Sequence, residues 1–300
     1  MQLHQIRNFV AVVENGSIRE AARRLGVSQP ALTKSVHALE ESIGAPLLSR
    51  SVRGVKLTEP GRLFLARARS VQSDLKRAQE EIAELAGKGR GRVALGIASV
   101  IGALLLPRTL VRLRERRPDV DVRVVEGTQE TLLPLLREGV LDLAACLKLE
   151  SEATAGFTVR PLARVRLVVA ARRGHPLRGA RTLAALQQGL WIGIRPRGGS
   201  GMLEHAYRLE GLEPPPARLQ CDAFGIQVAM LCESDAVALM TRQMLQQPSV
   251  KPLLEEIALA RQLPLLTMGL YRRADMQLTQ AAGDLMQALT SSTREMLRIA

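Results

Sequence analysis

Apolar residues recur at helical spacing through the first part of the chain, and strand-length apolar runs alternate with helical patterns in the remainder. Three short helices are predicted first, over residues 2–14, 17–25 and 28–40. Leu25, Gly26 and Val27 separate the second helix from the third, and glycine adopts the left-handed backbone of a tight turn at little cost. The second and third helices therefore form a helix-turn-helix.

The outer face of the third predicted helix is polar. Its apolar residues, at positions 32, 36 and 39, recur at helical spacing and face the preceding helix, so the exposed side chains are Gln29, Thr33, Lys34 and His37. Side chains of these types reach base edges and phosphates in the major groove of duplex DNA. The alternative is an ordinary antiparallel helix pair whose polar side is solvated. The Ala21-Ala22-x-x-Leu25-Gly26 turn favours DNA binding.

A short basic hairpin is predicted directly after the helix pair. Residues 47–50 and 55–57 flank Arg53 and Gly54, and arginine at such a tip can lie on phosphates or enter the minor groove. Residues 50–77 contain eight basic and two acidic side chains, whereas the formal charge of +13 is spread over the whole chain. The local excess of positive charge, more than the total, indicates a polyanionic partner for this part of the chain.

A long helix is predicted from Thr58 to about Ala86. Its apolar residues form a heptad seam, with Phe64, Val71, Ala78 and Leu85 at one position and Ala68, Leu75 and Ile82 at the other. Three repeats in register indicate a helix that pairs with a second copy of itself. Packing within one subunit is the alternative, because short heptad runs also occur on ordinary amphipathic helices.

A linker with three glycines in residues 87–91 marks a domain boundary. Beyond it, strands and helices alternate as in a parallel sheet. The predicted strands are 92–97, 118–125, 141–146, 165–170, 191–194, 219–222, 237–240 and 265–271. The predicted helices are 104–116, 131–137, 182–188, 202–210, 224–232 and 278–298. The last strand and helix are expected to return to the first lobe, so that two lobes crossed twice by the chain form a hinged clamp.

Neither the four histidines nor the glycine-rich segment 198–201 shows the spacing of a metal site or a nucleophile elbow. We therefore expect no catalytic residue, metal or cofactor, and the chain is not expected to be an enzyme. Cys146, Cys221 and Cys232 are predicted to be reduced structural thiols, with a redox pair of the last two as the alternative. The chain lacks an apolar run of membrane-span length and a signal-peptide core, which predicts a cytoplasmic protein with no membrane partner.

These features together resemble the LysR-type transcriptional regulators. The resemblance rests on Ala21-Ala22-x-x-Leu25, Ser28-Gln29-Pro30-Ala31, Leu39-Glu40, Leu57-Thr58-x-x-Gly61 and the long helix that follows. It continues through a Leu104-Leu105-Leu106-Pro107 turn, Gly139-Val140-Leu141-Asp142, His175-Pro176-Leu177 and residues 278–282. It covers essentially the whole chain.

The resemblance implies an α/β protein with a mainly α-helical winged helix-turn-helix, a linker helix, and a two-lobed, periplasmic-binding-protein-like sensor domain. The implied boundaries are 1–58 for the DNA-binding domain, 59–87 for the dimerisation helix, 88–91 for a hinge and 92–300 for the effector-binding domain. Lobe I is expected to comprise 92–161 and 267–300, and lobe II 162–266. The implied assembly is a bacterial homotetramer on an inverted-repeat operator, with RNA polymerase as a further candidate partner.

By position, the resemblance implies DNA contacts at Gln29, Pro30, Thr33, Lys34, Arg50 and Arg53. It implies an effector cleft lined by Ser99, Val100, Ile101, Thr128, Leu147, Arg195, Arg197, Ser200, Asp222 and Phe224. Hydroxyl groups, a helix N-terminus after the glycine-rich turn and the two arginines suit a small organic anion, which Asp222 would repel unless an arginine pairs with it. The alternative is a ligand-independent DNA-binding repressor or architectural protein with a non-functional cleft.

Overall fold

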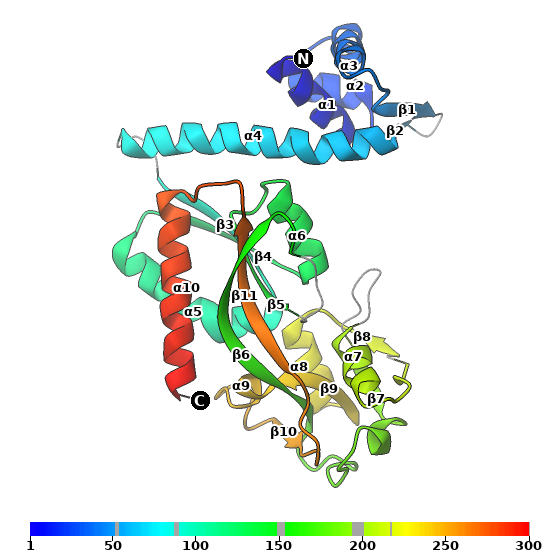
Figure 1. Ribbon diagram of the computed structural model, residues 1–300, viewed down its shortest axis with the longest axis vertical. Coiled ribbons are helices and arrows are strands. Elements are labelled where there is room, and N and C mark those ends of the chain that lie inside the picture. Colours follow the sequence, from blue (N-terminus) through cyan, green and yellow to red (C-terminus); the bar gives the residue numbers. More distant parts are fainter. Residues whose placement is uncertain (52–53, 87–89, 149–153, 194–200, 217, 300) are drawn as a thin grey trace. The chain divides into compact units, whose positions relative to one another are not determined.

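The computed structural model (Figure 1) describes residues 1–51, 54–86, 90–148, 154–193, 201–216 and 218–299. The chain divides into two units. One comprises residues 1–89 with the short segment 137–140, and the other comprises residues 90–136 and 141–300.

The N-terminal unit contains the predicted helices and hairpin. Its elements are α1 (Leu3–Asn15), α2 (Ile18–Leu25), α3 (Gln29–Ile43), β1 (Leu48–Ser51), β2 (Gly54–Leu57) and α4 (Glu59–Leu85). Gly26 ends α2 in the left-handed conformation, with φ of 67°, as the turn requires. Ser17 and Ser28 cap α2 and α3, and the Glu20 carboxylate pairs with Arg23.

The core of this unit lies beneath the helix-turn-helix. Phe9 of α1 is fully buried, and its ring packs edge-on against Phe64 of α4 with the centroids 5.4 Å apart. A neighbouring cluster joins α1 to α2 and α3 through Val12, Ala21 and Leu32. Leu3 at the start of α1 is 58% exposed. Ile6, Phe9 and Val10 of the same helix are buried, so α1 is the third helix of a small bundle.

Hydrogen bonds attach the hairpin to α3 and α4. Glu40 Oε1 accepts from the main-chain N–H groups of Leu47 and Leu48, at 2.8 and 3.0 Å. Thr58 Oγ1 donates to the Pro46 carbonyl and accepts from Gly61 N at 3.0 Å. Glu40, Thr58 and Gly61 therefore act together, because their hydrogen bonds fix the two ends of the hairpin against α3 and α4.

The apolar seam of α4 divides into two parts. Phe64 and Ala68 pack against the core of their own unit. The expectation that the whole seam contacts a second copy of the helix is therefore wrong for the first repeat. Val71, Leu75 and Ile82 are 41%, 45% and 67% exposed, and Ala78 between them is also exposed. The described part of the seam that is open to a second copy therefore runs from residue 71 to residue 82.

The second unit contains parallel and antiparallel strand pairs, and one long strand, β6 (Phe157–Arg172), pairs with strands of both lobes. In the first lobe, β3 (Arg92–Ile97) pairs in parallel with β4 (Asp121–Glu126) and β5 (Leu143–Lys148). In the second lobe, β9 (Ala236–Thr241) and β7 (Leu190–Gly193) are parallel, β8 (Leu219–Gln220) follows β7, and β10 (Leu254–Ile257) pairs with β6. Figure 1 shows β6 (Phe157–Arg172) and β11 (Leu265–Arg273) running side by side between the lobes.

Helices cover these sheets. The first lobe carries α5 (Ser99–Arg116), α6 (Gln129–Arg137) and α10 (Gln280–Ile299), and the second carries α7 (Met202–Leu209), α8 (Phe224–Cys232) and α9 (Arg242–Leu245). The predicted turn at Pro107 is wrong, because α5 continues through this proline. The predicted helix over 182–188 is only a short 3₁₀ segment, Ala184–Leu186.

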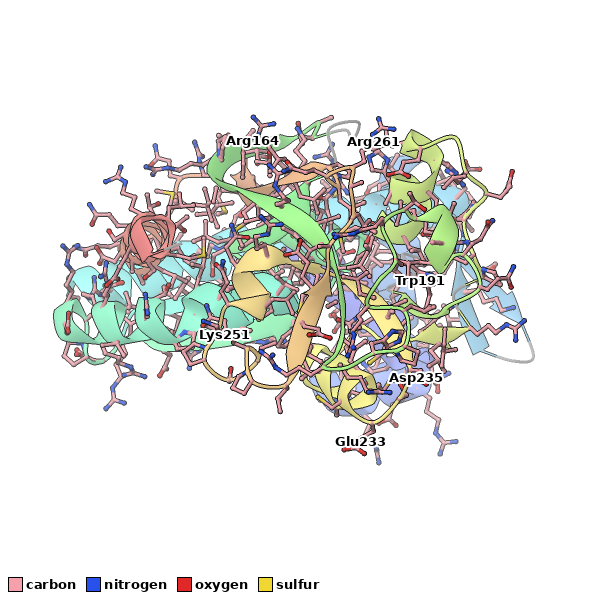
Figure 2. All side chains as sticks on the ribbon, turned by 90° about the horizontal axis from the view of Figure 1, so that it is seen from below. Arg164, Trp191, Glu233, Asp235, Lys251 and Arg261 are labelled. Carbon is pink, nitrogen blue, oxygen red and sulfur yellow. The ribbon has the colours of Figure 1, made fainter. Side chains whose placement is uncertain are left out.

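Two aromatic side chains anchor the second lobe. Trp191 (Figure 2) and Tyr207 are fully buried, and their rings meet edge-on with the centroids 5.8 Å apart. Trp191 Nε1 donates to the Leu186 carbonyl and the Tyr207 hydroxyl to the Leu183 carbonyl. Burial raises the pKa of Tyr207 to about 12, so this hydroxyl remains a donor throughout the physiological range.

Candidate functional site

The polar side of α3 is open along the helix. Gln29, Pro30, Lys34 and His37 are exposed and Thr33 is half-buried, and with Ala38 and Glu41 they line a groove of about 510 Å³. His37 Nδ1 lies 3.2 Å from Glu41 Oε1, so the C-terminal end of the groove holds a carboxylate. The first two turns of α3 instead offer amide, hydroxyl and ammonium groups, which are the groups that bind bases and phosphates.

The basic hairpin is described only in part. Arg50 belongs to β1, but its side chain lies outside the described residues, as does Arg53 entirely. Lys56 of β2 is exposed and is paired in register with Ser49. Among the described side chains of the two strands, Lys56 therefore carries the positive charge.

A cavity of about 480 Å³ opens in the second unit, between its two lobes, and is called the cleft below. Five of the expected effector residues line it, namely Ser99, Val100, Thr128, Leu147 and Asp222. Ile101 is fully buried in the core of the lobes, and Phe224 packs against that core, so neither lines the cleft. The expected residues Arg195, Arg197 and Ser200 lie outside the described residues.

Three helices begin at the cleft without a capping side chain. Their N-cap residues are Ala98 for α5, Gly201 for α7 and Ala223 for α8, and all three line the cavity. The first N–H groups of a helix have no partner within the helix and form the positive end of its dipole. A fourth helix, α6, begins here after Thr128, whose main-chain N–H donates to Thr131 Oγ1 at 3.0 Å. The Thr128 hydroxyl has no hydrogen-bond partner within the described part of the chain.

Several lining residues were not expected from the sequence. Glu126, Glu130, Lys148 and Met202 also face the cavity. Glu126 ends β4 and Lys148 ends β5, and the carboxyl ends of parallel strands meet at one edge of a sheet, where ligands bind. Ser99 and Thr128, which the family resemblance implied, lie just beyond β3 and β4 at this same edge.

Neither a metal cluster nor a spanning helix is found among the described residues. His, Cys, Asp and Glu side chains do not gather there in groups of three or more that could hold a metal ion. None of the helices that the structure describes is long and apolar enough to cross a membrane. Cys146 is buried, and Cys221 and Cys232 are partly buried free thiols.

Comparison with known proteins finds regulators with the same organisation. The chain is 34% identical over 250 residues to the HTH-type transcriptional regulator BudR of Raoultella terrigena, over 81% of this chain and 86% of BudR. It is 31% identical over 251 residues to the regulator GbpR of Azospirillum brasilense, over 82% and 73% of the two chains. The solved structure of CbnR, a LysR family transcriptional regulator, matches with a TM-score of 0.67 at 22% identity, over 98% of this chain and 99% of CbnR.

Two protein-family models match the chain, one in each of its two parts. Residues 3–62 match "Bacterial regulatory helix-turn-helix protein, lysR family", and residues 86–294 match "LysR substrate binding domain". The second match alone covers more than half of the chain. The protein therefore belongs to the LysR family of DNA-binding transcriptional regulators, which are not enzymes.

Proposed function

We propose that this protein is a sequence-specific regulator in the bacterial cytoplasm whose DNA binding is switched by a small organic anion held in the cleft. The observation that carries the effector proposal is the convergence of three uncapped helix N-termini, those of α5, α7 and α8, on one cavity. Anions satisfy such termini through hydrogen bonds and through the helix dipole. The unpartnered Thr128 hydroxyl adds a donor.

The rival function is that of a ligand-independent repressor or architectural protein. Such a protein does not need an open cleft, and side chains could fill the space between the lobes. The cavity of about 480 Å³ favours the effector-switched regulator, because it lies in the size range of small-molecule sites.

We further propose how the protein engages its operator. α3 reads base edges, α4 pairs two subunits, and the two recognition helices meet successive major grooves of an inverted repeat. A tetramer forms through the C-terminal domains, and RNA polymerase is the partner when the protein activates transcription. The boundaries at residues 58, 87 and 91 separate the DNA-binding domain, the dimerisation helix, the hinge and the sensor.

Substituting Gln29 with alanine tests base readout. Gln29 is exposed in the first turn of α3, so its removal leaves the fold intact. We expect a loss of about 1 to 3 kcal/mol on the operator and little change on random DNA, measured by fluorescence anisotropy. Equal losses on both sequences would contradict base readout by this side chain.

Lys56→Ala is the matched control, because Lys56 is an exposed basic residue on the hairpin. A phosphate contact carries no sequence information, so this variant weakens binding to both DNAs alike. The slope of log affinity against log salt concentration falls by about 1.

A further inference from the structure

The charged side chains that line the cleft are mostly acidic. Glu126, Glu130 and Asp222 are exposed there, whereas Lys148 is the one cation among the described lining residues. None of the three carboxylates forms an ion pair within the described part of the chain. A simple anion would therefore meet repulsion from this side of the cavity, although the helix N-termini attract it.

The Ser99 hydroxyl lies beside two hydrogen-bond acceptors in the cleft. Its Oγ atom lies 2.5 Å from Glu126 Oε1, on its own lobe, and 3.1 Å from the main-chain oxygen of Asp222, on the other lobe. A serine hydroxyl carries one proton and can donate it to one of these acceptors at a time. Two acceptors, one from each lobe, therefore compete for the single proton of the Ser99 hydroxyl.

We propose that the effector is a zwitterion, with a carboxylate and an ammonium group on a small aliphatic frame. The inference rests on the proposed effector switch and specifies its ligand. The carboxylate binds the uncapped N-termini of α5, α7 and α8, and the ammonium group binds Glu126 and the Asp222 carbonyl. The frame lies against Val100, Leu147 and Met202, which contribute the apolar surface.

The ammonium group matches the acceptors better than other donors do. It carries three N–H donors and a full positive charge, so it can serve Glu126 and Asp222 together while Ser99 keeps its own bond. A hydroxyl group supplies one proton and no charge. Because the ammonium group bridges the lobes, its binding adds a second link between them beside the contact of Ser99 with Asp222.

The test uses the full-length protein and matched compounds that share one carbon skeleton. Alanine, valine and leucine are each compared with the corresponding hydroxy acid, the carboxylic acid without the amino group and the amine without the carboxylate. Binding is measured by calorimetry and by the shift in melting temperature, and switching by the change in the operator footprint. We expect at least one amino acid to bind about tenfold or more tightly than its three analogues.

Two substitutions assign the ammonium site. Glu126→Gln keeps an acceptor for Ser99 but removes the negative charge, and should weaken the amino acid about tenfold while leaving the unsubstituted carboxylate unchanged or tighter. The control is Glu233→Gln, since Glu233 (Figure 2) is exposed and is not among the residues that line the cleft, and it should change the binding of neither ligand.

The outcomes separate this inference from the proposed function. If the unsubstituted carboxylates bind as tightly as the amino acids, or Glu126→Gln has no effect, the zwitterion assignment is wrong and the anion switch stands. If only the amines bind, both the zwitterion and the anion are wrong. If none of the amino acids binds, the zwitterion is overturned whatever other anion proves active.

Discussion

Gly61→Ala is expected to lower the free energy of unfolding of the N-terminal unit by about 3 kcal/mol or more. Gly61 lies in the first turn of α4, and a Cβ atom built on it would stand 1.9 Å from the carbonyl oxygen of Leu47. That oxygen also accepts from Thr58 N at 3.0 Å, and Thr58 Oγ1 accepts from Gly61 N. Space for a methyl group therefore requires the hairpin and α4 to separate, which breaks these bonds.

Gly283→Ala provides the matched control, because Gly283 also lies within a helix, α10, and a Cβ atom there would meet nothing within 4 Å. Alanine is the better helix former, so this variant should be stabilised by up to about 1 kcal/mol. Urea unfolding followed by circular dichroism compares the two substitutions. If the Gly61 variant unfolds at the same urea concentration as the parent protein, the close packing of α4 against the hairpin is wrong.

Leu75→Arg should separate the two subunits of the proposed α4 dimer and reduce affinity for an inverted-repeat operator by about a hundredfold or more. Leu75 lies at the centre of the exposed part of the α4 seam, between Val71 and Ile82. In a paired seam its side chain meets apolar residues of the second copy, where an arginine would be buried without a partner. Sedimentation velocity should report a species of half the mass or smaller.

The control for this experiment is Leu63→Arg. Leu63 is 72% exposed on the same helix but lies outside the heptad positions, so the same charge is added without entering the seam. Its mass and operator affinity should match those of the parent protein. An unchanged oligomer and footprint for Leu75→Arg would show that α4 is not the dimer contact.

The helix-turn-helix could be predicted because its signals are local. Gly26 ends α2 in the expected left-handed conformation, and Ser17 and Ser28, which precede α2 and α3, accept from main-chain N–H groups within one turn of themselves. The helix over 224–232 and the start of the strand at Leu265 were also placed correctly. Local propensity and the hydrophobic pattern agree in these segments.

Other elements depend on contacts distant in sequence. Pro161 lies inside β6, a strand predicted to begin only at Val165, and Pro107 lies inside α5. Proline normally interrupts such elements, but the pairing of β6 with β11 and the packing of α5 on α10 maintain them. The division of the α4 seam was not predictable either, because Phe64 becomes a core residue only once α1 places Phe9 against it.

Only part of the cleft could be predicted. The resemblance to the LysR family, and not the pattern of the chain itself, implied Ser99, Thr128 and Asp222, which line the cavity. The partnership of Ser99 with Glu126 depends on β3 and β4 lying side by side, which the sequence does not state. The acidic character of the described lining could not be predicted either, because it depends on which strand ends the fold brings together.

The two long strands constrain how the sensor can move. β6 and β11 form one antiparallel ladder between the lobes, and its register shifts between Met268 and Gly269, opposite residues 161–163 of β6. A β-bulge bends the strand that carries it and increases the local twist. We therefore expect the two lobes to move relative to each other by bending and twisting at this point of the ladder, so that the proposed effector would act on the angle between them.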